Sequence, residues 1–168
     1  MSNETKPINV LFLCTHNSTR SILAEAVLNN MGKARFRAYS AGSSPHENQI
    51  PNPLGLQVLQ TAGIATEGLH SKSWNVFAGP NAPQMNLIIT VCDKAAGEVC
   101  PVWPGHPATA HWGYPDPSEG NSTQAEKLEA LRKTLHAIKR RLELFCSLPD
   151  AKLEQALLQT SARQLANT

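Results

Sequence analysis

The chain has 168 residues, the size of one ordinary domain, of which 41% are apolar and 17% are charged. This balance excludes a disordered chain, and the formal net charge of +2 is too small to indicate a nucleic-acid partner. No apolar run approaches membrane-spanning length, and the first residues lack the pattern of a secretory signal. We therefore expect a cytoplasmic protein without a membrane partner. Its four cysteines should stay reduced, and four thiols indicate redox, nucleophilic or metal chemistry more than a disulfide scaffold.

The first half of the chain predicts two strands and two helices in alternation. Residues 10–13 form a short apolar run typical of a buried strand. From about residue 19, apolar residues recur every three or four positions until Gly32, a common helix stop. Residues 35–42 alternate like a strand, and residues 51–63 begin with prolines and end in a glycine, as helices often do.

The second half predicts one further strand, a long loop and a long helix. Residues 85–92 form an apolar run that ends in a cysteine, as the first strand does. Residues 93–121 are rich in glycine and proline, so we expect a long loop, which inside a compact domain is usually functional. Apolar residues recur at helical spacing over 122–146. Strands that alternate with helices indicate an α/β fold with helices on both faces of a parallel sheet.

The segment between the first strand and the first helix has the features of an anion-binding loop. In a parallel sheet, ligands bind at the carboxyl ends of the strands, which is where Cys14 lies. The loop then enters a helix N-terminus, whose free N–H groups favour an anion. We expect an oxyanion to be bound by the loop residues Thr15, His16, Asn17, Ser18 and Thr19 together with Arg20.

Within this loop, two residues carry the chemistry and others support them. The planar guanidinium of Arg20 can bind two oxygens of a tetrahedral oxyanion. The same positive surroundings are expected to lower the pKa of the Cys14 thiol and make it a nucleophilic thiolate. The Ser21 hydroxyl can donate a hydrogen bond to that thiolate, and Asn17 tolerates a left-handed backbone. The alternative, a merely buried cysteine beside an unrelated arginine, does not account for the placement of both between a strand and a helix.

The segment VLFLCTHNSTRSILAEA closely resembles the low-molecular-weight protein tyrosine phosphatases and the arsenate reductases that share their fold. The resemblance extends from about Val10 to about Phe145. It implies a four-stranded parallel sheet of flavodoxin-like topology, with Cys14 as the nucleophile and Arg20 as the oxyanion ligand.

On this resemblance, the chain divides into a flexible arm over residues 1–7, a phosphatase-like catalytic domain over 8–147 and a helical tail over 148–168.

Residues of the predicted loop distinguish the two branches of this family. Both branches use an Asp-Pro pair as the general acid, which Asp116 and Pro117 match. Tyrosine phosphatases usually carry aromatic residues directly after the pair, whereas this chain has a serine and a glutamate. Thioredoxin-coupled arsenate reductases have two additional cysteines, matched by Cys92 and Cys100, and a His-Trp-Gly segment, matched by residues 111–113.

The resemblance therefore implies an arsenate reductase that needs no cofactor. Cys14 would attack arsenate, Cys92 would attack Cys14 as arsenite leaves, and Cys100 would carry the disulfide to a reductant. That reductant would be thioredoxin, or glutathione with glutaredoxin, and phosphate or sulfate would compete with arsenate. A low-molecular-weight tyrosine phosphatase is the first alternative, and a non-catalytic oxyanion or thiol redox sensor is the second.

No metal site is predicted, although the chain has two sets of residues that resemble metal ligands. Four residues offer zinc-type ligands: Cys92, Cys100, His106 and His111. Their spacing is not that of a usual zinc finger or ribbon.

Some members of the family bind potassium behind the anion loop, and three of its ligand positions are matched by Asn17, Glu25 and Ser40. The fourth position, an aspartate in those members, is Ser73 here, and the ammonium of the neighbouring Lys72 could take the place of the ion.

Overall fold

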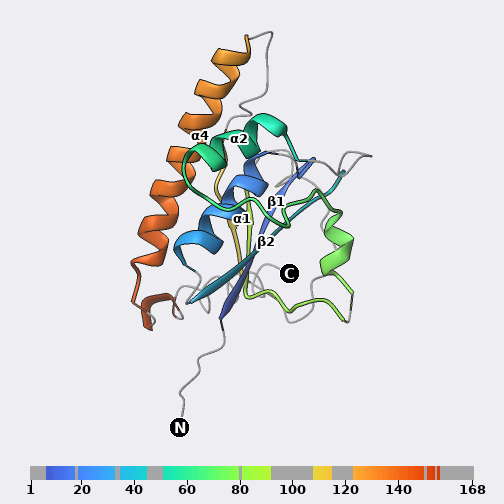
Figure 1. Ribbon diagram of the computed structural model, residues 1–168. Helices are drawn as coiled ribbons and strands as arrows, with labels where there is room; N and C mark the ends of the chain where they lie inside the picture. The colour runs from blue at the N-terminus through green and yellow to red at the C-terminus, as the bar shows by residue number, and fades with distance from the viewer. Residues whose placement is uncertain are drawn as a thin grey trace.

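The computed structural model describes residues 7–17, 19–32, 35–44, 51–79, 81–91, 108–114, 123–149, 151–153 and 155. Its strands are β1 (Ile8–Cys14), β2 (Phe36–Gly42), β3 (Leu87–Thr90) and β4 (Ala108–His111). Its helices are α1 (Arg20–Met31), α2 (Pro53–Thr61), the short 3₁₀ helix η1 (Trp74–Phe77) and α4 (Gln124–Cys146). Figure 1 shows the helices gathered around a central sheet.

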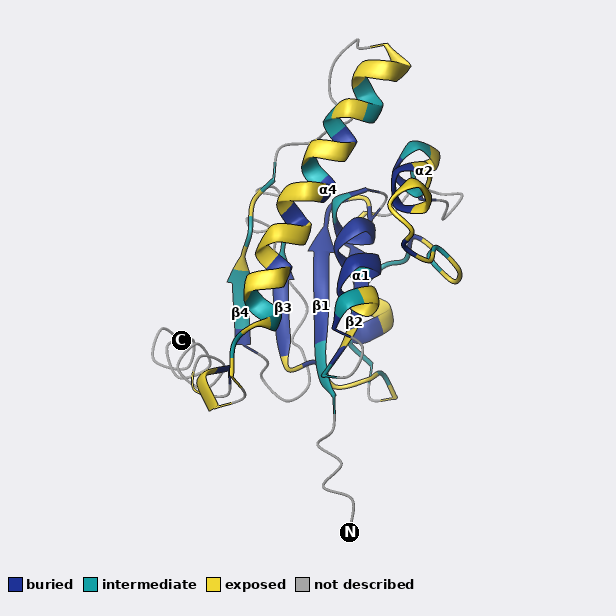
Figure 2. Cartoon of the chain, turned by 60° about the vertical axis from the view of Figure 1, so that its left-hand side comes forward, coloured by how far each residue is buried: buried dark blue, intermediate teal, exposed yellow. Residues whose placement is uncertain are grey.

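The sheet has the strand order β2-β1-β3-β4, and every neighbouring pair is parallel. The four-stranded, flavodoxin-like α/β fold expected from the sequence is therefore confirmed. Strand β1 lies in the interior, and its Leu13 is opposite Ala41 on one side and Thr90 on the other. Because a parallel strand of this kind is covered on both faces, β1 is buried without interruption from Val10 to Cys14 (Figure 2).

Successive residues of β1 point into two different apolar layers. Phe12 faces a large core to which α1, α2 and α4 contribute, and α1 packs directly against α4. Leu11 and Leu13 face a smaller core that includes Phe77 of η1 and Met85. Both faces of the sheet are thus covered, as predicted. The sequence did not reveal η1, because four residues are too few to show a helical period.

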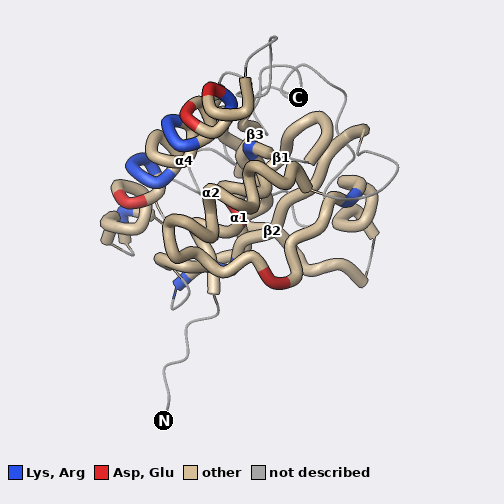
Figure 3. The backbone as a smooth tube through the Cα atoms, turned by 45° about the horizontal axis from the view of Figure 1, so that its top comes forward, with Lys and Arg blue, Asp and Glu red and all other residues tan. Residues whose placement is uncertain are grey.

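Helix α4 matches the helix predicted over residues 122–146. Thr123 caps its first turn, because its hydroxyl accepts a hydrogen bond from the Glu126 N–H at 3.2 Å. The buried residues of the helix repeat every three or four positions: Leu131, Leu135, Ile138 and Leu142. Charged residues gather along the rest of this helix (Figure 3), so α4 places one apolar stripe on the sheet and turns its charges outward.

The prediction of an uninterrupted loop over residues 93–121 is wrong, because residues 108–111 form β4. This strand has only four residues, and it is defined by its pairing with β3, in which Ile88 lies opposite Thr109. A segment this short has no local period that could separate a strand from a loop, so its structure depends on a distant partner strand.

Helix α4 ends at Cys146, the chain turns at Ser147, and residues 151–153 and 155 are helical. Leu153 of this segment is buried in the large core. Among the helices of the described ranges, none is both long enough and apolar enough to span a membrane.

Candidate active site

Cys14 is the last residue of β1, and Arg20 is the first residue of α1. The Cys14 side chain lies in the interior, with 4% of its residue surface exposed. Between the two, Thr15, Asn17 and Thr19 are buried, while Ser18 lies outside the described residues. The structure therefore brings the predicted nucleophile and the predicted oxyanion ligand to the two ends of one short, tightly packed loop.

Asn17 holds this loop in its curved shape. Its φ of 51° places it in the left-handed region that was predicted for this residue. Its buried side chain accepts a hydrogen bond from the Lys72 N–H at 2.9 Å and donates one to the Ser21 hydroxyl at 2.8 Å. Its carbonyl accepts a hydrogen bond from the Ser71 hydroxyl at 2.6 Å. The loop is thus fixed by buried contacts to α1 and to the segment before η1.

Ser21 accepts a hydrogen bond from Asn17, and its own hydroxyl hydrogen remains for donation to another acceptor. This arrangement is compatible with the predicted hydrogen bond from Ser21 to the Cys14 thiolate, which stays a prediction. Ser21 is fully buried, so its hydroxyl is shielded from water.

Gly42 lies against the back of the loop, at the end of β2. A Cβ atom at this position would lie 2.6 Å from the Thr15 carbonyl oxygen and 2.9 Å from the Asn17 nitrogen. Contacts this short with backbone atoms force the backbone to move. The close approach of β2 therefore depends on a residue without a side chain.

We expect Gly42→Ala to weaken the anion site. The added methyl group should displace the loop and raise the phosphate concentration that half-protects Cys14 from iodoacetamide by about tenfold or more. The matched control is Gly79→Ala, because a Cβ at Gly79 meets no atom within 4 Å. Equal phosphate protection in both variants would show that the loop does not require this close contact.

Arg20 reaches across the sheet edge to the segment after β4. Its half-buried guanidinium donates a hydrogen bond from Nη1 to the Tyr114 carbonyl at 2.9 Å. This contact joins residues that are 94 positions apart in the sequence. Sequence reasoning did not identify Tyr114, and its position two residues before Asp116 was the one available signal.

Backbone hydrogen bonds bring the ends of β1 and β3 together. The Val91 N–H donates to the Leu13 carbonyl at 2.9 Å. These two residues directly precede Cys92 and Cys14 in the sequence. The other predicted site residues of this region, Cys92, Cys100 and Asp116, lie outside the described residues.

His16, which lies in the loop, and His70, which lies in the segment before η1, both make local contacts. The His16 ring is exposed, and its Nδ1 lies 3.0 Å from the Ser44 carbonyl oxygen. His70 has a similar contact, 3.0 Å from the Gly68 carbonyl. The predicted role of His16 in oxyanion binding stays a prediction.

A largely buried ion pair lies behind the loop, and each of its two side chains is 13% exposed. Lys72 Nζ is 3.9 Å from Glu25 Oε1 and donates hydrogen bonds to the carbonyls of Ser40 and His70 at 3.0 and 2.8 Å. The Ser40 hydroxyl donates to Glu25 at 2.6 Å. Of the three residues that the resemblance matched to potassium ligands, Glu25 and Ser40 contact the Lys72 ammonium, whereas Asn17 contacts the Lys72 backbone N–H.

Burial acts on both members of this pair. It raises the pKa of Glu25, and the hydrogen bond from Ser40 and the charge of Lys72 offset that rise only in part. It also lowers the pKa of Lys72, against the opposing effect of Glu25. Burial disfavours the charged form of each group. Each group therefore relies on the opposite charge of the other to stay ionised.

We expect Lys72→Met to destabilise the chain by roughly 1–4 kcal/mol, because Glu25 would lose the neighbouring charge that compensates for its burial. The pKa of Glu25 would then rise further above its ordinary value of 4.5. The folded chain would bind a proton that the unfolded chain has released, so the free energy of unfolding should fall more steeply above pH 4.5 than in the wild type.

Urea unfolding between pH 4 and 7 measures this slope. The double variant Glu25→Gln/Lys72→Met is the control, since it has no carboxyl group to titrate and should lose the added pH dependence. An unchanged slope in Lys72→Met would mean that the ammonium does not compensate Glu25.

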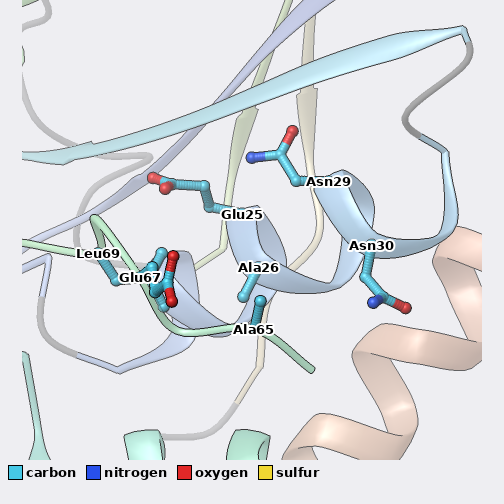
Figure 4. A pocket seen from close by; sticks show the side chains of 7 residues that line it. All are labelled: Glu25, Ala26, Asn29, Asn30, Ala65, Glu67 and Leu69. Atoms are coloured by element: carbon cyan, nitrogen blue, oxygen red, sulfur yellow. The ribbon is translucent and has the colours of Figure 1, made fainter. Parts of the chain in front are cut away.

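A pocket of about 260 Å³ lies beside α1, between this helix and residues 65–69. Figure 4 shows Glu25, Asn29 and Glu67 among the side chains that line it. Glu25 extends from α1 toward β2, where it accepts the hydrogen bond from Ser40. None of the seven lining residues belongs to the predicted oxyanion loop, so this pocket is separate from the candidate active site.

The site consists of a cysteine at the end of a central parallel strand, a buried loop and an arginine at a helix N-terminus. This arrangement is typical of enzymes in which a cysteine thiolate attacks a bound oxyanion. The comparison with known families agrees with this class. The chain belongs to the low molecular weight phosphotyrosine protein phosphatase family, whose sequence pattern matches residues 9–158.

Several similar proteins are arsenate reductases. One from Bacillus licheniformis is 30% identical over 136 residues, which cover 81% of this chain and 93% of that protein. A solved thioredoxin-dependent arsenate reductase of Corynebacterium glutamicum is 26% identical with a TM-score of 0.54, over 83% of this chain and 64% of that one. An arsenate reductase in its phosphate binding state has a TM-score of 0.67 at 24% identity, over 83% and 97% of the two chains, and this likeness concerns the fold alone.

Proposed function

We propose that this protein is an arsenate reductase in which Cys14 is the nucleophile. The observation that carries the proposal is the loop between β1 and α1, where a buried cysteine and Arg20 flank a left-handed Asn17 held by three hydrogen bonds. A rigid loop of this kind at a helix N-terminus suits a tetrahedral oxyanion. The curated relatives named arsenate reductase support the choice of arsenate.

In the first step, the loop binds arsenate and Cys14 attacks it. Residues 15–19 and Arg20 hold the oxygens, and the Cys14 thiolate forms a sulfur–arsenic bond as one oxygen leaves as water. Asp116 supplies the proton for that oxygen. Arsenic remains at its higher oxidation state in this covalent intermediate.

In the second step, a thiol relay reduces arsenic. The Cys92 thiolate attacks the Cys14 sulfur, the electron pair of the sulfur–arsenic bond passes to arsenic, and arsenite leaves. A disulfide between Cys14 and Cys92 remains. Cys100 then attacks Cys92, which frees Cys14 as a thiolate and transfers the disulfide to Cys92 and Cys100. The hydrogen bond from Val91 to Leu13 supports this relay, because it pairs the residues that precede Cys92 and Cys14.

An external thiol reductant must return the two electrons. Thioredoxin is the proposed reductant, because the relay of three cysteines ends in an intramolecular disulfide that thioredoxin can reduce. The similar thioredoxin-dependent enzyme supports this choice. Glutathione with glutaredoxin is the alternative. We propose a cytoplasmic location, where such reductants operate, and we expect phosphate and sulfate to compete with arsenate for the loop.

A phosphotyrosine phosphatase is the second candidate, favoured by the family to which the chain belongs. In its first step Cys14 would form a sulfur–phosphorus bond while the tyrosine phenol leaves with a proton from Asp116. In its second step water, not Cys92, would attack the phosphorus and release phosphate and the Cys14 thiolate. The Ser-Glu pair after Asp116-Pro117, where phosphatases usually carry aromatic residues, disfavours it. A non-catalytic sensor would need no general acid such as Asp116.

One assay separates these candidates: turnover of arsenate and of para-nitrophenyl phosphate, each with and without thioredoxin and its reductase. We expect arsenite formation that depends on thioredoxin, and at most a slow hydrolysis of the phosphate ester. Fast hydrolysis without arsenite formation would identify a phosphatase. No turnover of either compound, with thioredoxin or with glutathione and glutaredoxin as the reductant, would identify a sensor.

A further inference from the structure

The backbone of Tyr114 connects two parts of the proposed active site. Its N–H donates to the Val91 carbonyl at 3.1 Å, one residue before Cys92, and its carbonyl accepts the hydrogen bond from Arg20 at 2.9 Å. Tyr114 also precedes Asp116 by two residues. A displacement of this one residue would therefore move the hydrogen-bond partner of Arg20, and it would also disturb the segments that lead to Cys92 and Asp116.

Few backbone contacts hold this peptide. Strand β4 ends at His111, and beyond it the described hydrogen bonds to β3 and Val91 are those donated by the Trp112 N–H, at 2.8 Å to Thr90, and by the Tyr114 N–H. Side-chain packing must supply the remaining restraint.

The restraint comes from α4, on which Arg141 faces two aromatic rings. The Arg141 guanidinium carbon lies 5.5 Å from the ring centroid of Trp112 and 5.4 Å from that of Tyr114. The Trp112 ring is in turn anchored, with Phe12 of β1 and Phe145 of α4 at centroid distances of 6.5 and 6.0 Å. One guanidinium thus links both aromatic residues of the segment to α4, a long helix whose apolar stripe is buried in the core.

We propose that Arg141 is a positioning residue for the oxyanion site: it fixes the Tyr114 segment through its two aromatic contacts, and Tyr114 in turn fixes Arg20. The inference rests on the proposed function, because it assigns Arg20 to the anion. A planar guanidinium suits this task, since it can face two rings at once, which a lysine ammonium does less well. Arg141 is exposed and acts from outside the site, so its loss leaves the core intact.

The test uses inorganic phosphate, which binds without being reduced, and measures the concentration that half-protects Cys14 from iodoacetamide. We expect Arg141→Ala to raise this concentration about three- to tenfold, as expected from the loss of two cation–π contacts. Arg141→Lys should restore part of the affinity. The neighbouring Arg140→Ala is the matched control, since Arg140 is also exposed on α4, and it should leave the concentration within about twofold of the wild type.

Combination with Arg20→Ala shows whether Arg141 acts through Arg20. In that background Arg141→Ala should cause no further loss of phosphate affinity, because the contact it supports has already been removed. The same additional loss in both backgrounds, or unchanged protection in the Arg141→Ala single variant, would overturn the inference. If phosphate still fully protects Cys14 in Arg20→Ala, Arg20 does not bind the anion, and both the proposed site and the inference are wrong. If Arg20→Ala loses this protection and Arg141→Ala does not, the inference alone is wrong.

Discussion

Replacing Cys14 with serine is expected to abolish arsenate reduction. A serine hydroxyl does not ionise near neutral pH, even beside a helix N-terminus and Arg20, so no covalent bond to arsenic forms. The loop geometry should survive, because serine is close to cysteine in size. Arsenite release with thioredoxin and its reductase measures the effect, and phosphate binding by calorimetry verifies that the anion site is intact.

Cys146→Ser is the matched control for this experiment. Cys146 is half-buried at the end of α4, and burial raises the pKa of its thiol, so it stays protonated and unreactive. The control should reduce arsenate at the wild-type rate. A Cys14→Ser variant that keeps more than about a tenth of the wild-type rate would remove Cys14 from the mechanism.

Replacing Cys92 with serine is expected to separate reduction from hydrolysis. The variant should lose thioredoxin-coupled arsenate reduction, because no thiol remains to attack the Cys14 sulfur. Any slow hydrolysis of para-nitrophenyl phosphate should stay within a few-fold of the wild type, since water completes that reaction without a second thiol. Measuring both activities on the same preparation makes hydrolysis the internal control for folding.

Asp116→Ala is the matched comparison for Cys92→Ser. Both reactions need a proton on the leaving oxygen, so this variant should slow both by roughly 10²–10⁴-fold. If Cys92→Ser keeps full thioredoxin-coupled reduction, the relay is wrong, and a glutathione-dependent route with Cys14 as the single nucleophile becomes the leading account.

The sequence predicted the centre of the fold well, because that part depends on local signals. A continuous apolar run specifies the buried β1, and a regular helical spacing specifies α4. Helix α1 was also predicted, but it is buried over most of its surface and not along one face. The left-handed backbone of Asn17 could also be predicted, because asparagine itself tolerates this conformation better than most residues.

Features that depend on distant partners could not be predicted in the same way. Strand β4 exists through its pairing with β3, and four residues do not reveal that pairing. The hydrogen bond from Arg20 to Tyr114 joins residues 94 positions apart, and no local pattern indicates it. The role of Lys72 could be predicted in part. Its place in the sequence beside Ser73, which matches the fourth potassium ligand, suggested an internal ammonium, but its hydrogen bonds to Ser40 and His70 were seen only in the structure.

A single turnover without any external reductant tests the central claim most directly. The fully reduced protein is mixed with excess arsenate, arsenite is counted by chromatography with arsenic detection, and the cysteine pairing is mapped by mass spectrometry after acid quenching. The proposed mechanism predicts about one arsenite per chain, together with a disulfide that joins Cys92 to Cys14 or to Cys100. Fully reduced cysteines with no arsenite formed would contradict it.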